Sequence, residues 1–376
     1  MKTKLLFTFL FIAIFSTSYS QQEATDYLSN LEEPSGMVNK GNILYVQGLK
    51  KLYEINTASG SPTANVIYTA ETNYYMSNLT ISGNIIYISE ENYDEDFDTS
   101  SGCRIIALDT NNPGAPLNVI YTTTNYVSAL AITGSNLYFA SETTPDANDK
   151  FTVQVKKINI TNLAVETVVS NLCEDEAAND MAFHNNNLLI SVGNLQTVFG
   201  FDTTETVISV SQYMTNLNFN KGLFVNGNNV FIAEGNRIGT KPLNVQASLT
   251  YVAQNTFYKD NINGLFNANF RDVVLIGDKL YMTLLNQGKV VTVQDPALSK
   301  DKFNQDLKAV SISNSKTSLI VSGLESNHNA TVYNLAGQLI ATKKLSAGEN
   351  SIDLSTFSNG VYVLQLDNQK TFKFIK

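Results

Sequence analysis

The sequence has few of the side chains that carry most enzyme chemistry. Its 376 residues include no tryptophan, two histidines and two cysteines. Histidine is the side chain that most often transfers protons in catalysis, so mechanisms built on histidine are nearly excluded. The sequence also contains no spacing typical of a zinc site, no glycine-rich phosphate loop and no Gly-x-Ser-x-Gly motif.

Basic residues are outnumbered as well. There are 25 Lys and Arg residues against 34 Asp and Glu residues, which gives a net charge of −9. Such a chain is poorly suited to hold phosphate backbones or an anionic membrane surface, so we expect no nucleic-acid partner. With 7 prolines and 43% hydrophobic residues, the chain is neither dominated by linkers nor disordered.

The chain begins with the layout of a secretory signal peptide. Lys2 and Lys4 precede an apolar run at residues 5–15, and small residues end at Ser20. This pattern predicts a signal peptide over residues 1–20 that is recognised by the Sec machinery. The run is shorter than the roughly 20 residues that a membrane helix needs. No later stretch is long enough either, so we predict no membrane span and export through the periplasm.

One short pattern recurs six times along the rest of the chain. Each copy is a polar turn, opened by Gly or Asn, that leads into an apolar run with the composition of a buried strand. Gly and Asn accept the positive φ of tight hairpin turns. The copies begin 42, 51, 51, 42 and 50 residues apart, at residues that we call the turn anchors: Gly41, Gly83, Gly134, Asn185, Gly227 and Gly277. Further apolar segments flank each turn, and about four strands per repeat are typical of β-propeller blades.

The repeats predict an all-β fold with a six-bladed β-propeller over residues 21–300. The sixth repeat has only three strands, because Pro296 and a polar stretch follow its third strand. Residues 26–31 precede the first repeat, and we predict that they supply the missing strand. This pairing would close the ring and remove its exposed edges. An open β-sandwich of the same strands is the alternative.

One repeat resembles a known repeat family. The run VFIAEGNRI at residues 230–238 is similar to the core of an NHL repeat, in which an acidic residue ends one strand and Asn-x-Arg-Ile opens the next. The chain thus resembles six-bladed propellers of the broad class that includes the NHL-repeat and TolB-like families. The resemblance implies the architecture of the ring and no particular activity.

The chain changes character after Pro296. Residues 301–306 are polar and charged and are predicted to form a linker. Residues 307–376 contain four further strand-like segments, which predict a small C-terminal β-sandwich.

Four motifs of this tail resemble the type A C-terminal sorting domain of the type IX secretion system, an export route of Bacteroidota. They are VYNLAGQ at 332–338, an Asn-x-Ile-Asp-Leu-Ser run at 350–355, NGVY at 359–362 and KTFKFIK at the C-terminus. The residues that carry the match are Tyr333, Asn334, Gly337, Gly360, Tyr362 and Lys376. The resemblance implies a transport address that binds the type IX machinery and is cleaved outside the cell. An ordinary accessory sandwich is the alternative.

Three acidic loops are predicted to lie on neighbouring blades at one end of the ring, which we call the loop face. They are residues 90–98, 142–149 and 174–180. Within the first loop, Asp94, Asp96 and Asp98 have the spacing that opens a calcium loop. Thr99 stands where such loops need glycine, so two interpretations remain. The loops either bind Ca²⁺, the one cofactor that the sequence suggests, or are solvated acidic surface.

Acidic residues also end the second strand of three blades, at Glu90, Glu142 and Glu234. We predict that these carboxylates point toward the mouth of the axial channel and, with Tyr93, bind a ligand. Paired carboxylates can also perform general acid–base catalysis, but no residue is assigned a catalytic role.

Cys103 and Cys173 are both predicted to lie on the loop face. Export places them in an oxidising compartment, so a disulfide between them is one alternative and two free thiols are the other. On the chain-entropy model the disulfide would add about 4 kcal/mol of stability.

The sequence as a whole predicts a secreted or cell-surface propeller. It would bind an unidentified extracellular ligand, either a glycan, a peptide or a surface partner, through its loop face. The alternative is a propeller-type hydrolase, lyase or dehydrogenase that uses channel carboxylates with Ca²⁺. A rigid structural spacer is the third hypothesis.

Overall fold

The computed structural model describes residues 22–96, 99–148, 150–243, 248–256, 269–294, 311–315, 317–324, 327–334, 338–366 and 370–376. The chain divides into two compact units between Val293 and Gln294. No helix among these described residues is long and apolar enough to cross a membrane.

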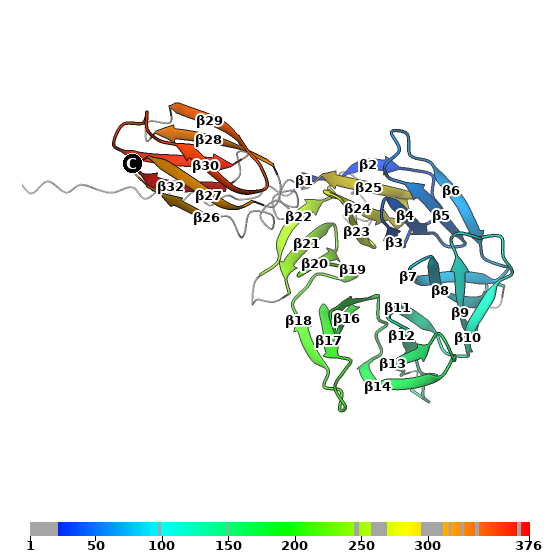
Figure 1. The fold of residues 1–376 in the computed structure, drawn as a ribbon. Coiled ribbons are helices and arrows are strands. Elements are labelled where there is room, and N and C mark those ends of the chain that lie inside the picture. Colours follow the sequence, from blue (N-terminus) through cyan, green and yellow to red (C-terminus); the bar gives the residue numbers. More distant parts are fainter. Residues whose placement is uncertain are drawn as a thin grey trace, which may run out of the picture. The chain divides into compact units, whose positions relative to one another are not determined.

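The first unit is a six-bladed β-propeller, as predicted, with the blades arranged around a central axis (Figure 1). In blades 1 to 4 the sheet is antiparallel and its strands pair in sequence order from the axis outward, while blades 5 and 6 each gain a strand from the N-terminus. Blades 1 and 2 are β3 (Gly36–Lys40), β4 (Ile43–Gln47), β5 (Lys51–Asn56) and β6 (Ala64–Thr69), then β7 (Tyr74–Ser82), β8 (Ile85–Asp94), β9 (Thr99–Asp109) and β10 (Asn118–Thr123). Blades 3 and 4 are β11 (Val127–Thr133), β12 (Asn136–Glu142), β13 (Thr152–Asn159) and β14 (Val165–Glu174), then β15 (Asp180–His184), β16 (Asn187–Val192), β17 (Thr197–Asp202) and β18 (Ser211–Met214). Blades 5 and 6 are β19 (Asn220–Asn226), β20 (Asn229–Glu234), β21 (Arg237–Pro242) and β22 (Thr250–Gln254), then β23 (Val273–Ile276), β24 (Lys279–Leu284) and β25 (Lys289–Gln294).

The turn anchors explain why each blade starts with the same hairpin. All six have a left-handed backbone: φ is 57°, 60°, 55°, 54°, 56° and 65° at Gly41, Gly83, Gly134, Asn185, Gly227 and Gly277. Residues with a Cβ rarely adopt this conformation, apart from Asn and Asp. The spacing of Gly and Asn therefore records the spacing of the hairpins that join the first two strands of each blade.

The N-terminal residues close the ring, as the sequence predicts. β2 (Thr25–Leu28) pairs antiparallel with β25 and completes blade 6. Just beyond it, the backbone N–H of Leu31 donates to the carbonyl of Gly288 at 3.0 Å. Gly288 has φ +59°, and a Cβ there would lie 2.6 Å from the Leu31 carbonyl oxygen. One pairing was not predicted: β1 (Gln22–Glu23) adds a parallel strand to the outer edge of blade 5.

The hydrophobic core lies between neighbouring blades, so each sheet buries both of its faces. Between blades 2 and 3, for example, Tyr87 and Ile105 pack with Leu130 and Phe139. This two-sided burial explains why the second strands are continuous apolar runs rather than alternating ones.

The second unit is a small β-sandwich, as predicted. Its two sheets have the strand orders β26-β27-β30 and β29-β28-β31-β32. The strands are β26 (Ser311–Asn314), β27 (Ser318–Leu324), β28 (His328–Asn334), β29 (Leu339–Leu345), β30 (Gly348–Asp353), β31 (Val361–Leu366) and β32 (Lys370–Ile375). Leu319 and Val321 of one sheet and Val332 and Leu364 of the other form a shared core.

Three of the predicted sorting residues, Gly360, Tyr362 and Lys376, fix the C-terminal strand to the rest of this sandwich. The Lys376 ammonium donates to the carbonyl oxygens of Leu354, Ser355 and Phe357, and the Lys376 N–H donates to Gly360 at 2.9 Å. The Tyr362 ring stacks on Phe374, another residue of the last strand, with 5.6 Å between the ring centroids.

Two further sorting residues, Tyr333 and Asn334, end strand β28. Asn334 accepts the Gln338 N–H at 3.0 Å, and Tyr333 pairs with Val363 of β31. Gly337 lies outside the described residues.

The ring closure generates a first prediction. Tyr27 of β2 packs edge-on against Tyr281 of β24, with 5.0 Å between ring centroids. Tyr27→Ala should lower the free energy of unfolding by about 2 kcal/mol, because it removes a half-buried ring and an aromatic pair. Urea unfolding followed by circular dichroism measures the change. Tyr27→Phe keeps the ring and should stay close to the wild type; equal midpoints for Tyr27→Ala and the wild type would contradict the role given to β2.

Candidate functional site

The axial channel is lined by the innermost strand of every blade. One position on these strands stands five residues before each turn anchor, and we call it the clamp position. It holds a polar residue in blades 2, 4 and 6 and a small residue in blades 1, 3 and 5. In blade order the residues are Gly36, Asn78, Ala129, Asp180, Gly222 and Asp272.

The polar clamp residues each bind the next blade. A side-chain oxygen accepts a backbone N–H from the inner strand of the following blade, and blade 6 binds blade 1 in this way. The three bonds are Leu130 N–H to Asn78 Oδ1 at 3.0 Å, Leu223 N–H to Asp180 Oδ2 at 2.7 Å and Met37 N–H to Asp272 Oδ2 at 2.6 Å. Three blade-to-blade bonds therefore encircle the channel.

Small residues at the other clamp positions make room for these bonds. A Cβ on Gly222 would lie 2.3 Å from Asp272 Oδ1, and a Cβ on Gly36 would lie 2.7 Å from Leu79 Cδ2. Contacts this short force the backbone or the neighbouring side chain to move. The alternation of polar and small residues is thus a packing requirement of the channel.

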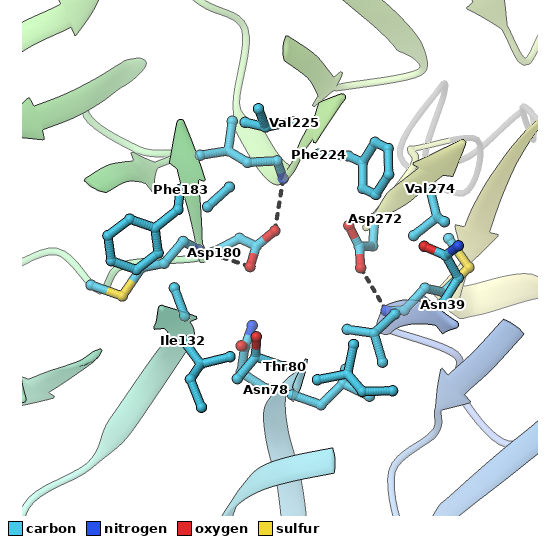
Figure 2. Close-up of a pocket in the computed structure, with 18 residues that line it drawn as sticks. Asn39, Asn78, Thr80, Ile132, Asp180, Phe183, Phe224, Val225, Asp272 and Val274 are labelled. Carbon is cyan, nitrogen blue, oxygen red and sulfur yellow. Dashed lines mark hydrogen bonds between the residues drawn. The ribbon is translucent and has the colours of Figure 1, made fainter. Parts of the chain in front are cut away.

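Asp180 and Asp272 face one another across the channel (Figure 2). Each also accepts the N–H of the residue that follows it, Met181 at 2.8 Å and Val273 at 2.7 Å. Burial raises the pKa of Asp180 to about 7, against the pull of its two backbone donors. Burial and the neighbouring Asp180 raise the pKa of Asp272 well above its ordinary value. With Asn78, these carboxyl groups form the waist of the channel, since all three line the cavities on both sides of it.

The cavity on the side away from the loop face has a mixed polar and apolar lining. It has a volume of about 260 Å³ and runs from the waist toward the turn anchors. Phe183, Phe224, Val225 and Val274 form much of its wall (Figure 2).

The cavity on the loop-face side is polar, and we call it the channel mouth. It has a volume of about 250 Å³. Every blade contributes the residue six positions before its turn anchor: Ser35, Ser77, Ser128, Asn179, Lys221 and Arg271. Blades 1 to 3 therefore supply hydroxyl groups, while blades 5 and 6 supply two cations.

Within the described part of the chain, neither Lys221 nor Arg271 forms an ion pair with an acidic side chain, although both are half-buried. Burial lowers the pKa of both groups, and Arg271 lowers that of Lys221 further. Glu176 acts in the opposite direction on Lys221, but its carboxylate accepts a hydrogen bond from Asn194 at 2.6 Å.

The same cations also border a second cavity of about 310 Å³ beside the channel mouth. Its wall includes Phe219 and Asn194, together with Asn286 of the short 3₁₀ turn η2 (Leu285–Gln287). The two cavities share Lys221, Arg271 and Leu285.

The structure places two predicted ligand residues between blades instead of at the channel mouth. Glu90 is 0% exposed, because it accepts hydrogen bonds from Arg104 and from Tyr68 of blade 1, each at 2.7 Å. Glu234 is 3% exposed and accepts bonds from the Asn218 N–H and the Tyr251 hydroxyl, also at 2.7 Å. Both carboxylates join structural elements, and neither lines the channel.

Glu142 and Tyr93 lie nearer the solvent. Burial, helped by the adjacent Glu91, raises the pKa of Glu142 to about 7. The Tyr93 ring packs edge-on against Tyr75, with 6.2 Å between centroids, and Lys50 lies over the Tyr75 ring at 4.1 Å.

The predicted calcium loop is only partly described, because Asp98 lies outside the described residues. Asp94 accepts the Asp96 N–H at 3.0 Å, which is a local turn contact. No group of three or more His, Cys, Asp or Glu side chains among the described residues is arranged to hold a metal ion.

Both cysteines are free and buried, so the structure has the thiol alternative and no disulfide. Cys103 packs in the core between blades 2 and 3, whereas Cys173 packs in the core between blades 3 and 4. The sheet of blade 3 therefore separates the two sulfur atoms. Burial raises the pKa of each thiol to about 12.

The clamp and mouth residues were not singled out from the sequence, although a signal was present. Aligning the six repeats on their turn anchors puts all clamp residues in one column and all mouth residues in the column before it. Asp272, Lys221 and Arg271 stand in these columns and outside the acidic loops.

Residues 299–376 match a family model described as a secretion system C-terminal sorting domain. The chain therefore carries the predicted type IX sorting domain, which implies export to the cell surface or into the medium. No curated protein matches the chain.

Solved structures support the fold of the ring. A luciferin-regenerating enzyme is similar with a TM-score of 0.53 and 15% identity, over 72% of this chain and 93% of that one. An auxiliary nutrient binding protein from Bacteroides ovatus is similar with a TM-score of 0.50 and 8% identity, over 72% of this chain and 75% of that one. At these identities the likeness concerns the fold alone.

The channel waist generates a second prediction. The raised pKa of Asp180 means that the folded protein keeps a proton that the unfolded chain loses above about pH 4. Stability should therefore fall as pH rises from 5 to 7, by about 2 kcal/mol for this group alone, and Asp272 should extend the fall to higher pH.

The variant Asp180→Asn with Asp272→Asn should lose much of this slope and exceed the wild type at pH 8. Asn78 already makes the same bond as an amide, so the clamp should persist. Thermal unfolding between pH 5 and 8 measures the difference, with the exposed Glu205→Gln as a control. Parallel curves for the double variant and the wild type would refute the assignment.

Proposed function

We propose that the exported propeller is a binding protein that holds an extracellular ligand at the channel mouth without converting it. The observation that carries the proposal is that several polar groups at the channel mouth have no hydrogen-bond or ion-pair partner among the described residues. Ser128 is 6% exposed and its hydroxyl has no hydrogen-bond partner among the described residues, and the two mouth cations lack an ion pair.

Polar groups removed from water without a partner reduce stability, typically by about 1–3 kcal/mol each. Proteins keep such groups mainly where a ligand or ordered water supplies the missing contact. The channel mouth offers a concave site with a few converging polar groups, which is the usual form of a small-ligand site.

The enzyme alternative has weaker support. A general acid or base must reach the substrate with a free oxygen, yet the oxygens of Asp180 and Asp272 accept backbone N–H groups and those of Glu90 and Glu234 accept structural bonds. Glu142, with its pKa of about 7, is the carboxylate best suited to catalysis among those predicted.

A panel of neutral oligosaccharides, sugar acids and short peptides tests the binding proposal. At least one member should raise the melting temperature of the mature protein, since a ligand at a hundredfold excess over Kd adds about 2.7 kcal/mol. Ala177→Trp, which fills part of the mouth, should abolish the shift. Ala58→Trp, at an exposed turn on the opposite end of blade 1, should leave it intact. Binding that survives Ala177→Trp, or turnover of the bound compound, would contradict the proposal.

The role of the tail is tested separately by a chain that ends at Leu298 and so lacks the matched residues. Without its sorting domain this chain should accumulate in the periplasm and be absent from the surface and the medium. Residues 299–376 fused to a periplasmic reporter should carry that reporter out of the cell. Normal export of the shortened chain, by cell fractionation and immunoblot, would overturn the assignment.

A further inference from the structure

The two cations at the channel mouth indicate that its ligand carries a negative charge. Lys221 and Arg271 come from neighbouring blades and border both cavities at the mouth. Two half-buried cations that have no ion pair among the residues the structure describes repel each other, which is consistent with the lowered pKa of Lys221 beside Arg271. An anion placed at both would relieve the repulsion and offset part of the desolvation cost. Arginine in particular can hold a carboxylate through two parallel bonds.

The surroundings favour a single negative charge. Glu176 acts on Lys221, and the whole chain has a net charge of −9. A dense polyanion or a doubly charged phosphate would be repelled by this negative charge. A ligand with one carboxylate and no other charge would be repelled less than either of these.

Phe219 indicates the chemistry of the neutral part of the ligand. Its side chain is 48% exposed and borders the cavity next to Lys221. Its φ of +49° is a left-handed conformation that a bulky residue rarely adopts. The backbone thus holds an apolar ring at the rim of the second cavity, beside Lys221, where an apolar C–H face of a ligand can pack on it.

The opposite side of the mouth suits hydroxyl groups. Ser35, Ser77 and Ser128 contribute hydroxyls from blades 1 to 3, and the buried Ser128 hydroxyl is without a partner among the described residues. Asn194 and Asn286 add amide groups beside the cations. A ring with hydroxyls on its edge, apolar C–H groups on its face and one carboxylate matches all three surfaces.

We propose that the channel mouth binds a carboxylate-bearing sugar, with the carboxylate at Lys221 and Arg271, the sugar ring on Phe219 and its hydroxyls toward the serine side. This inference rests on the proposed binding function and names the chemical class of its ligand. An acidic peptide shares the carboxylate but lacks the hydroxylated ring.

Calorimetric titration of the mature protein at low salt provides the test. The probes are the methyl glycosides of galacturonate and glucuronate, the methyl esters of both, which keep the ring and lose the charge, and N-acetyl-triglycine, which keeps one carboxylate and lacks the ring. At least one acid should bind, with its ester and the peptide at least tenfold weaker. Equal affinity for acid and ester, equal affinity for the peptide, or no binding of either acid would overturn the proposal.

Variants locate the contacts. Lys221→Gln and Arg271→Gln should each weaken the acid at least tenfold while changing the ester little, so that the preference for the acid shrinks. Phe219→Ser should weaken acid and ester alike. Lys279→Gln removes an exposed charge at the opposite end of blade 6 and should not change the affinity. An equal loss of affinity in this variant would show that the net charge of the protein, and not a contact at the mouth, determines binding.

Lys221→Arg and Arg271→Lys keep the charge and control for folding, which melting curves monitor in every variant. The outcome also separates the two proposals. A ligand of another class that is displaced by Ala177→Trp would leave the binding function standing and refute the sugar acid. A uronate that binds equally well to Ala177→Trp protein would refute both.

Discussion

The centre of the ring depends on a side-chain oxygen in every second blade that accepts a backbone N–H from the next blade. Inner strands of a propeller do not pair with each other as a sheet, so without these bonds the three N–H groups of Met37, Leu130 and Leu223 would be buried beside the channel without partners. The remaining blades are joined by other bonds, such as that from the Gly222 N–H to the Arg271 carbonyl at 3.0 Å between blades 5 and 6. Two of the intervening clamp positions, Gly36 and Gly222, also require glycine, because a Cβ there would meet the neighbouring blade.

Two of the three clamps are carboxyl groups, although an amide performs the same task at Asn78. Burial raises the pKa of both carboxyl groups, and Asp180 raises that of Asp272 further, so the ring loses stability at neutral pH that amides would retain. Natural sequences keep such unfavourable groups at functional positions more often than elsewhere. The waist lies directly below the channel mouth, so these carboxyl groups form its floor.

The sequence predicted the ring well because its signal is local and repeated. Turn anchors with a required left-handed backbone gave the number of blades, and the missing strand of the sixth repeat indicated the closure by β2. The site was harder to predict because side-chain partners come from other blades. Glu90 was predicted to point toward the channel mouth, but its carboxylate accepts hydrogen bonds from Arg104 and from the Tyr68 hydroxyl. Cys103 and Cys173 seemed close but lie on opposite sides of one sheet. Nothing in a single strand reveals either fact.

The residues that hold the ring together and the residues that face a ligand occupy two adjacent positions of the same repeat, the clamp position and the position before it. The clamp position must alternate between a polar and a small residue, because it joins one blade to the next. The position before it makes no blade-to-blade bond of this kind, and its six residues differ freely, from serine in blades 1 to 3 to lysine and arginine in blades 5 and 6. A substitution at the mouth can therefore change the charge that a ligand meets without loosening the ring. This separation allows one propeller scaffold to carry an asymmetric binding site at the end of a nearly symmetric channel.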